Sequence, residues 1–292
     1  MTRLCWPKEI AVAAGGDASL DHAGSNIALD LHGDPACARL VVFSDGNHHM
    51  ALLDVLAAFS TLHPEAGEPF FATTPPRVVS EWLERGALRV GNLRLSVRPH
   101  VFLSPPAVLA RLHAAGLLGP PAPVARNRGA VLLVPRGNPL GIRGIADLAR
   151  RDVRVFLSNP RTEKVSFDAY LDTLRRVAAR AGTALELIAA EGTPSPRLVF
   201  GEIIHHREAP QAVASGTADC AVVFAHLGLR YTRNFPDRFE TVALGHEDAH
   251  VRSDTHISLA GDGGEFGAAF VSFMRQPEAA SIYRHHGLDP LT

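Results

Sequence analysis

Short apolar runs of strand length alternate with amphipathic helix patterns along most of this chain, and the alternation limits the folds that it can adopt. In residues 38–64 the run ARLVVFS is followed by HMALLDVLAAFSTLHP, where Leu52, Val55, Leu56 and Phe59 recur at helical spacing. The same strand-then-helix order returns in the segments that follow. Roughly ten strands alternating with helices predict an α/β protein with mostly parallel sheets, and their number favours two sheets in two lobes.

The composition is that of a soluble globular protein, with 46% hydrophobic residues, 20% charged residues and a net charge of -1. The balanced charge argues against a nucleic-acid or membrane-surface partner, and no run of ~18 apolar residues predicts a membrane span. Three widely spaced cysteines form neither a zinc motif nor a disulfide framework. The first residues lack the apolar core of a signal peptide, so we expect a cytoplasmic protein, or a periplasmic one if a leader was removed.

Loops that follow strands in α/β sheets are the usual places for ligands, and two such loops lie in the first half of the chain. In SDGNHH, Asn47 suits a helix N-cap, and the amides of His48 and His49 fall in the first helical turn, which favours an anion. The alternative is that Asn47 only caps the helix and the histidines are solvated. In ATTPP, Thr73 and Thr74 either bind a ligand or form a simple turn before the next helix.

Two later loops have the same strand-to-helix position. SNPRTEKVSF enters a helix near Ser166 and carries Arg161 and Lys164, which we interpret as surface charges rather than ligand-binding groups. GEIIHHREAP places His205 and His206 before a short helix. Imidazole donates or accepts hydrogen bonds, binds metals and titrates near neutral pH, so a second histidine pair at such a junction favours a binding role.

Several familiar cofactor and catalytic motifs are missing from the sequence. It contains no Walker loop and no GxGxxG, GxSxG or CxxC motif, so no cofactor is predicted. A transition metal, if one bound, would have His48, His205 and His206 as ligands, but the spacing of the 15 histidines does not specify a metal.

From Arg39 to Pro290 the order of the motifs resembles that of type II periplasmic substrate-binding proteins, and it is most like their molybdate-binding branch. The matching segments are FSDGNHHMALLDVLAAF, FFATTPPRVVSEWLERG, PHVFLSPP, GNPLGIRGIADLARRDVRVFLSNPRTEKVSFDAYLDTL, APQAVASGTADCAVVF and AAFVSFMRQPEAASIYRHHGLDP. The resemblance implies two doubly wound mixed sheets in two lobes, joined by two crossing strands, with ligand held in the inter-lobe cleft. Lobe 1 would comprise residues 39–130 and 246–292, and lobe 2 residues 131–245, after an irregular arm at residues 1–38.

The resemblance also implies ligand-binding positions. Carried over by position, these fall on Asn47, Thr73, Thr74, Val165, Ser166, His206 and Phe224. Asn47 stands where the family has a binding serine, and Phe224 where it has a binding tyrosine. Both family residues are therefore replaced in this chain, which counts against molybdate as the ligand.

Three functions fit these observations. The first is a non-catalytic protein that binds a small anion, carboxylate or oxyanion through helix N-termini and histidines. The second is an isomerase of a di- or tricarboxylate, similar to aconitate isomerase, with His48 and His206 as acid and base. The third is a transition-metal binder that uses the histidines. We expect the first, in a monomer that works with an ABC transporter permease if it is exported.

Overall fold

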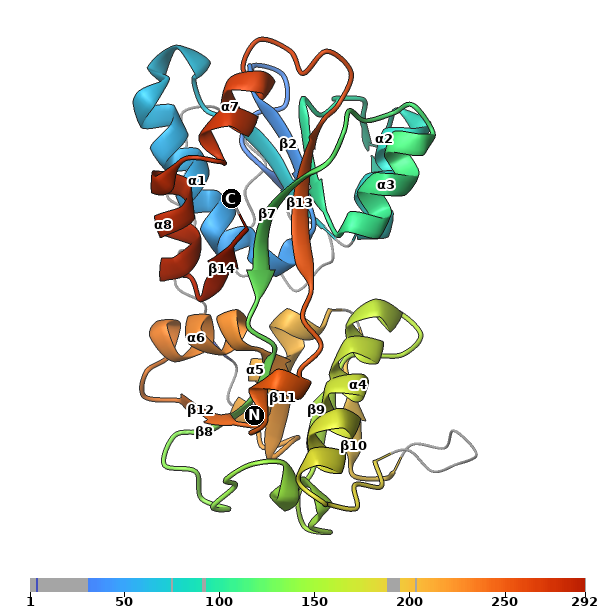
Figure 1. The fold of residues 1–292 in the computed structure, drawn as a ribbon, viewed down its shortest axis with the longest axis vertical. Helices are drawn as coiled ribbons and strands as arrows, with labels where there is room; N and C mark the ends of the chain where they lie inside the picture. The colour runs from blue at the N-terminus through green and yellow to red at the C-terminus, as the bar shows by residue number, and fades with distance from the viewer. Residues whose placement is uncertain are drawn as a thin grey trace. The chain divides into compact units, whose positions relative to one another are not determined.

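The computed structural model describes Leu4 and residues 31–74, 76–90, 93–187, 195–202 and 204–291. Most of the arm predicted at residues 1–38 therefore lies outside the described residues. The chain forms two compact units, and it passes from one to the other at Arg126–Asn127 and at Arg252–Ser253 (Figure 1). Unit 1 comprises Asn127–Arg252 with Met1–Pro7, and unit 2 comprises Lys8–Arg126 and Ser253–Thr292.

Unit 2 is built on a seven-stranded mixed sheet with the strand order β1-β3-β2-β6-β13-β7-β14. Three neighbouring strands, β3 (Phe70–Thr73), β2 (Val41–Ser44) and β6 (Val101–Ser104), run parallel with β2 in the middle. All of their residues are buried, as expected for parallel strands that are covered on both faces. The other strands are β1 (Leu31–His32), β7 (Ala122–Asn127), β13 (Asp254–Leu259) and β14 (Leu288–Pro290).

Helices cover both faces of this sheet. On one face lie α1 (His49–Leu62), α7 (Gly267–Phe273) and α8 (Pro277–His285), and on the other α2 (Pro76–Arg85) and α3 (Pro106–Ala114) (Figure 1). A two-stranded hairpin of β4 (Leu88–Val90) and β5 (Leu93–Leu95) follows α2.

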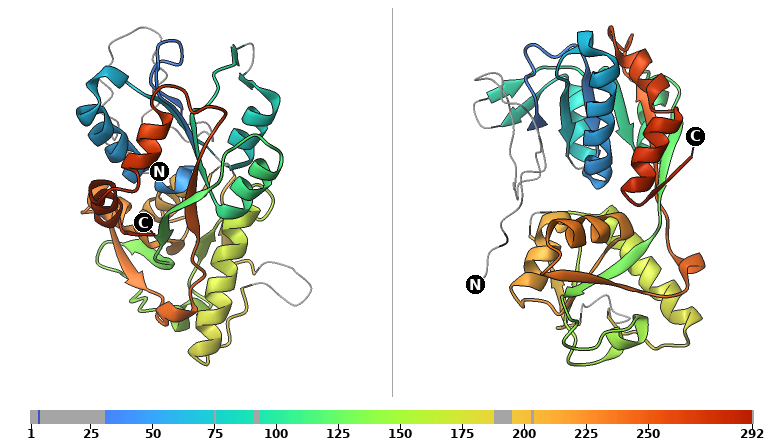
Figure 2. Two further views of the ribbon diagram at one scale, coloured as in Figure 1. Left: turned by 45° about the horizontal axis from the view of Figure 1, so that its top comes forward. Right: turned by 90° about the vertical axis from the view of Figure 1, so that its left-hand side faces the viewer.

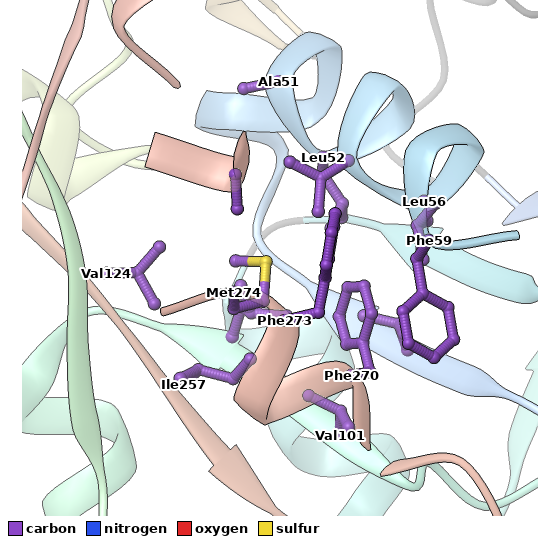
Figure 3. Packing of buried hydrophobic residues seen from close by; sticks show 14 of the residues in the cluster. Ala51, Leu52, Leu56, Phe59, Val101, Val124, Ile257, Phe270, Phe273 and Met274 are labelled. Atoms are coloured by element: carbon purple, nitrogen blue, oxygen red, sulfur yellow. The ribbon is translucent and has the colours of Figure 1, made fainter. Parts of the chain in front are cut away.

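Each face of the unit 2 sheet has its own apolar core. On the α1 face the ring of Phe59 lies 5.2 Å from that of Phe270 and 5.7 Å from that of Phe273, centroid to centroid (Figure 3). On the α2 face, Phe43 packs against Trp82 at 4.2 Å. The helical spacing of Leu52, Val55, Leu56 and Phe59 correctly predicted the buried face of α1.

Unit 1 contains a five-stranded sheet with the order β10-β9-β11-β8-β12. Its parallel strands are β10 (Leu198–Phe200), β9 (Val155–Leu157) and β11 (Cys220–Phe224), while β8 (Ala130–Pro135) runs antiparallel to β11 and to β12 (Phe239–Ala243). The helices are α4 (Lys164–Arg180), α5 (His205–Ala214) and α6 (Ala225–Asn234). Short 3₁₀ helices lie in both units: η1 (Gly46–His48) and η2 (Pro64–Ala66) in unit 2, and η3 (Ile145–Ala149) and η4 (Glu247–Ala249) in unit 1.

The two sheets share one winding rule. In each, the first strand of the parallel set lies between the next two, giving β3-β2-β6 in unit 2 and β10-β9-β11 in unit 1. The strand order thus reverses direction at β2 and at β9, and in such sheets ligands bind beyond the carboxyl end of the strand where the reversal occurs. The predicted α/β class and the two doubly wound mixed sheets are confirmed.

Helix α6 is the main element that the sequence pattern does not reveal. Its Gly228 weakens the helical signal, because glycine lowers helix propensity. A Cβ at this position would meet Val131 Cγ2 at 2.8 Å and Thr241 Cγ2 at 2.9 Å, so glycine permits the close approach of α6 to the sheet. Strand β11 ends at Phe224, and His226 lies in α6. Among the described residues, no helix combines the length and the apolar character that a membrane span requires.

Candidate functional site

Hydroxyl side chains gather where the three parallel strands of unit 2 end. Ser44, Thr73 and Ser104 are the last residues of β2, β3 and β6, and Thr74 follows directly. All four side chains are fully buried. Ser44 and Thr73 are register partners, and the Thr74 N–H donates to the carbonyl of Ser44 with an N···O distance of 3.1 Å. We call these four residues the hydroxyl edge of unit 2.

Three of the four hydroxyls lack a hydrogen-bond partner within the described part of the chain: Thr73 Oγ1, Thr74 Oγ1 and Ser104 Oγ. A buried hydroxyl without a partner costs about 1–3 kcal/mol, and such groups are rare in folded proteins. Three such hydroxyls lie together at neighbouring strand ends, where each can donate a hydrogen bond.

Ser44 is the exception, because its hydroxyl is engaged by the protein. Ser44 Oγ donates to the carbonyl of Asp45 at 3.0 Å and lies 2.9 Å from His48 Nε2, while His48 Nδ1 lies 3.0 Å from Tyr283 Oη. The imidazole of His48 is thus buried between a strand end and α8, whereas the sequence predicted it in the first turn of a helix facing a ligand.

The predicted N-cap at Asn47 is wrong. A turn of 3₁₀ helix, η1, is inserted between β2 and α1, so His48 is the N-cap residue of α1 and makes no side-chain capping bond. The side chain of Asn47 lies outside the described residues.

In unit 1 the central strand β9 also leads into a serine. Ser158 is fully buried, and its Oγ has no partner among the described residues. Asn159 holds the following loop, since its Nδ2 donates to the Gly201 carbonyl at 2.7 Å and its Oδ1 accepts from the Arg161 N–H at 2.9 Å. Ser158 was not singled out from the sequence, although its place at the end of an apolar strand was a usable signal.

Helix α4 begins near the predicted position, at Lys164. No side chain caps it, Val165 is 79% exposed, and Ser166 is half-buried. Arg161 and Lys164 are exposed, as predicted, and Lys164 Nζ lies 2.6 Å from Asp168 Oδ2. The backbone N–H groups in the first turn of α4 therefore have no side-chain cap, and such groups favour a negative charge.

At the start of α5, carboxylates of the protein already bind backbone donors. The His205 N–H donates to Glu163 Oε2 at 2.8 Å, and the N–H groups of Ile204 and Glu202 donate to Glu208 at 2.7 and 2.9 Å. Burial raises the pKa of Glu163 to about 7, and the nearby Glu208 carboxylate also raises it, against the lowering effect of the His205 N–H. The resemblance implied a backbone donor near His206. The neighbouring N–H groups of Glu202, Ile204 and His205 already donate to carboxylates of the protein.

The histidine pair of unit 1 is buried. The ring of His205 lies 5.6 Å from that of Phe156 and 5.1 Å from that of Tyr170, and burial lowers its pKa to about 3. The carbonyl of His206 accepts a 2.6 Å hydrogen bond from Tyr231 Oη. Among the described residues, no group of three or more His, Cys, Asp or Glu side chains is placed to hold a metal ion.

Phe224 lies within an aromatic cluster. Its ring is 4.6 Å from that of Tyr170, and its N–H donates to Tyr170 Oη at 3.2 Å. Tyr170 and the buried Arg207 and Arg230 are not among the residues that the sequence singled out. Burial lowers the pKa of Arg230 to about 10, so this side chain keeps its charge at neutral pH.

Comparison with known proteins agrees with this architecture. The sequence profile of a family described as bacterial extracellular solute-binding protein matches residues 40–289. No curated protein sequence matches the chain.

Among solved structures, the substrate-binding domain of a putative molybdenum ABC transporter from Clostridium difficile is similar, with a TM-score of 0.62 and 15% identity over 87% of this chain and 99% of that one. The periplasmic molybdate-binding protein of Azotobacter vinelandii has a TM-score of 0.60 and 18% identity over 85% and 98% of the two chains. PEB3, solved from Campylobacter jejuni and also with L-phospholactate bound, has a TM-score of 0.58 and 16% identity over 86% and 99%. At these identities the likeness shows the fold.

Proposed function

Because the chain belongs to the bacterial extracellular solute-binding proteins, we propose that it binds a small anion at the hydroxyl edge of unit 2. The observation that carries the proposal is the set of buried hydroxyls without partners at Thr73, Thr74 and Ser104. Hydroxyl groups donate hydrogen bonds to oxyanion and carboxylate oxygens, and hydrogen bonds to a charged group contribute about 1.5–3 kcal/mol each. An anion therefore supplies the acceptors that these donors lack.

Unit 1 offers groups of the same chemical preference. Ser158 has a buried hydroxyl without a partner, and the uncapped first turn of α4 follows it in the chain. The buried guanidinium groups of Arg207 and Arg230 add positive charge to this unit, which favours anions over cations. The proposed ligands are small oxyanions and small organic carboxylates or phosphates.

We also propose that the protein works outside the cytoplasm as the receptor of an ABC transporter. The support is membership of an extracellular solute-binding family and the likeness to the binding domain of a putative molybdenum ABC transporter. Co-purification with an ABC transporter permease, enhanced by the bound anion, would test this role.

The anion site is tested by isothermal titration and thermal shift with molybdate, sulfate, phosphate, citrate and phospholactate. Thr74→Val and Ser104→Ala each remove a hydroxyl, and we expect affinity for the bound anion to fall about 10- to 100-fold. Because these hydroxyls have no partner without ligand, the ligand-free variants should unfold at the same temperature as the native protein or higher.

Thr61→Val is the matched control, since Thr61 Oγ1 donates to the carbonyl of Ala57 on the exposed surface of α1. This variant should bind like the native protein. The proposal would be contradicted if the native protein bound none of the anions in the series. It would also be contradicted if Thr74→Val and Ser104→Ala both bound with native affinity.

A further inference from the structure

A chain of hydrogen bonds connects the C-terminal helix of unit 2 to the hydroxyl edge. Tyr283 on α8, His48 at the start of α1 and Ser44 at the end of β2 are all buried. His48 Nδ1 lies 3.0 Å from Tyr283 Oη, and His48 Nε2 lies 2.9 Å from Ser44 Oγ. Helices α1 and α8 lie side by side, blue and red in Figure 2, and the rings of His48 and Tyr283 are stacked with centroids 5.9 Å apart.

The direction of the hydrogen bonds follows from the single hydrogen of the serine. Ser44 donates that hydrogen to the Asp45 carbonyl, so His48 Nε2 is the donor toward Ser44 Oγ. In a neutral imidazole the other nitrogen is then an acceptor, and His48 Nδ1 accepts from the Tyr283 hydroxyl. Burial, together with the nearby Asp45 carboxylate, raises the pKa of Tyr283, so its hydroxyl stays protonated and remains a donor.

Ser44 connects this chain of bonds to the residues that lack partners. It lies on the central strand, in register with Thr73, and its carbonyl accepts from the Thr74 N–H. Side chains alternate along a strand, so Ser44 shares the sheet face of Val42, the face that α1 and α8 cover. A shift of Ser44 would therefore move the hydroxyls of Thr73 and Thr74 as well.

We propose that Tyr283 and His48 are positioning residues that act through Ser44 to hold the hydroxyl edge in the geometry that binds the anion. This inference rests on the proposed function, because it specifies how the same site is kept in order. It assigns a binding role to α8 although no residue of that helix belongs to the edge.

A double-mutant cycle tests the proposal, with affinities for molybdate, phosphate and citrate measured by titration. Tyr283→Phe keeps the ring and removes the hydroxyl, and we expect about a 3- to 10-fold loss of affinity. Ser44→Ala should cause a similar loss. In the double variant the tyrosine change should cause no further loss of affinity, because the hydroxyl of Tyr283 would act on the edge only through Ser44.

His48 provides the conservative rescue. His48→Gln keeps an N–H that can reach Ser44, so it should retain more affinity than His48→Leu, which offers no donor. The proposal would be overturned if Tyr283→Phe bound with native affinity, or if the two affinity losses multiplied in the double variant. Equal losses of affinity in the two His48 variants would also overturn it. Melting temperatures of all variants separate these effects from a loss of folded protein.

The cycle also distinguishes the two proposals. If the native protein binds none of the anions, or if Thr74→Val and Ser104→Ala both bind as tightly as the native protein, the proposed function fails and the positioning role falls with it. If Thr74→Val loses affinity while Tyr283→Phe does not, only the positioning role is overturned.

Discussion

Unit 1 and unit 2 place a buried serine at the end of the central strand of their parallel sets, but the two serines have different surroundings. Ser44 in unit 2 is held by His48 and the Asp45 carbonyl, and the hydroxyls beside it have no partners. Ser158 in unit 1 has no partner itself, and backbone donors at the nearby start of α5 are taken by Glu163 and Glu208.

This difference teaches that topology fixes where a site can form but not which groups are available there. In unit 2 the hydroxyl of the central residue, Ser44, has hydrogen-bond partners, and the hydroxyls beside it have none among the described residues. In unit 1 the hydroxyl of Ser158 has no partner among the described residues, and backbone N–H groups at the start of α5 donate to Glu163 and Glu208. We therefore expect equivalent substitutions in the two units to have unlike consequences.

The largest expected effect tests whether the units are stabilised separately. Phe270 is fully buried against Phe59 in unit 2, and Phe270→Ala should lower the free energy of unfolding of that unit by about 3–5 kcal/mol. Hydrogen exchange followed by mass spectrometry should show lost protection in α1, α7 and α8, with β9 and β11 unchanged. Equal loss of protection in both units would mean that they unfold as one.

The same serine-to-alanine change in both units sharpens the comparison directly. Ser44→Ala removes the buried hydrogen bond between Ser44 Oγ and His48 Nε2, and it should lower the free energy of unfolding by about 1–3 kcal/mol. Ser158→Ala removes a hydroxyl that has no partner, so stability should stay within about 0.5 kcal/mol while anion affinity falls about 10-fold. Chemical denaturation and titration measure both quantities. Equal destabilisation by the two changes would show that Ser158 has a structural partner.

The pH dependence of stability should reveal two opposing groups within unit 1. The pKa of Glu163 is raised from 4.5 to about 7, so between these values the folded state holds more protons and stability falls as pH rises. The pKa of His205 is lowered from 6.5 to about 3, so between those values the unfolded state holds more protons and stability rises with pH. Each effect is at most about 1.4 kcal/mol per pH unit, and they oppose one another between pH 4.5 and 6.5.

Single substitutions should separate these two slopes. Relative to the native protein, Glu163→Gln should become progressively more stable as pH rises from 4.5 to 7. His205→Asn should become progressively less stable, relative to the native protein, as pH rises from 3 to 6.5. Urea unfolding at several pH values gives both differences, and a difference that does not vary with pH would show that the substituted group does not titrate as inferred.

The sequence predicted the parts of the fold that depend on local pattern. The alternation of runs gave the two sheets, and the hydroxyls of Thr73 and Thr74 were chosen because they end a strand. What the sequence could not show are contacts made over long separations. His48 meets Tyr283 across 235 positions of the chain, so no spacing near His48 indicates that it is internal. Helix α6 was missed because Gly228 serves the close packing of the helix against β8 and β12, which only the folded structure reveals.

Burial of charge was equally invisible from sequence. Glu163 and Arg230 look like ordinary surface residues until the helices that carry them are packed on the sheet. The same packing brings the Glu163 carboxylate to the His205 N–H at the start of α5. Of helices α4 and α5, α4 is therefore the one whose first turn has no carboxylate of the described residues bound to it.

The smallest expected effect concerns the N-terminus of α4. Lys164 is 72% exposed at its side chain and pairs with Asp168 four positions along α4, an arrangement that contributes about 0.3–0.5 kcal/mol in exposed helices. Lys164→Ala should therefore change the free energy of unfolding by no more than about 0.5 kcal/mol, and anion affinity by less than about 2-fold at physiological salt, because exposed charges are screened. Asp168→Ala is the matched control, since it breaks the same pair and leaves the cation. A loss of affinity above 10-fold in Lys164→Ala alone would make Lys164 a ligand-binding residue, and the anion preference of unit 1 would then depend on a charged side chain rather than on Ser158 and the open amides of α4.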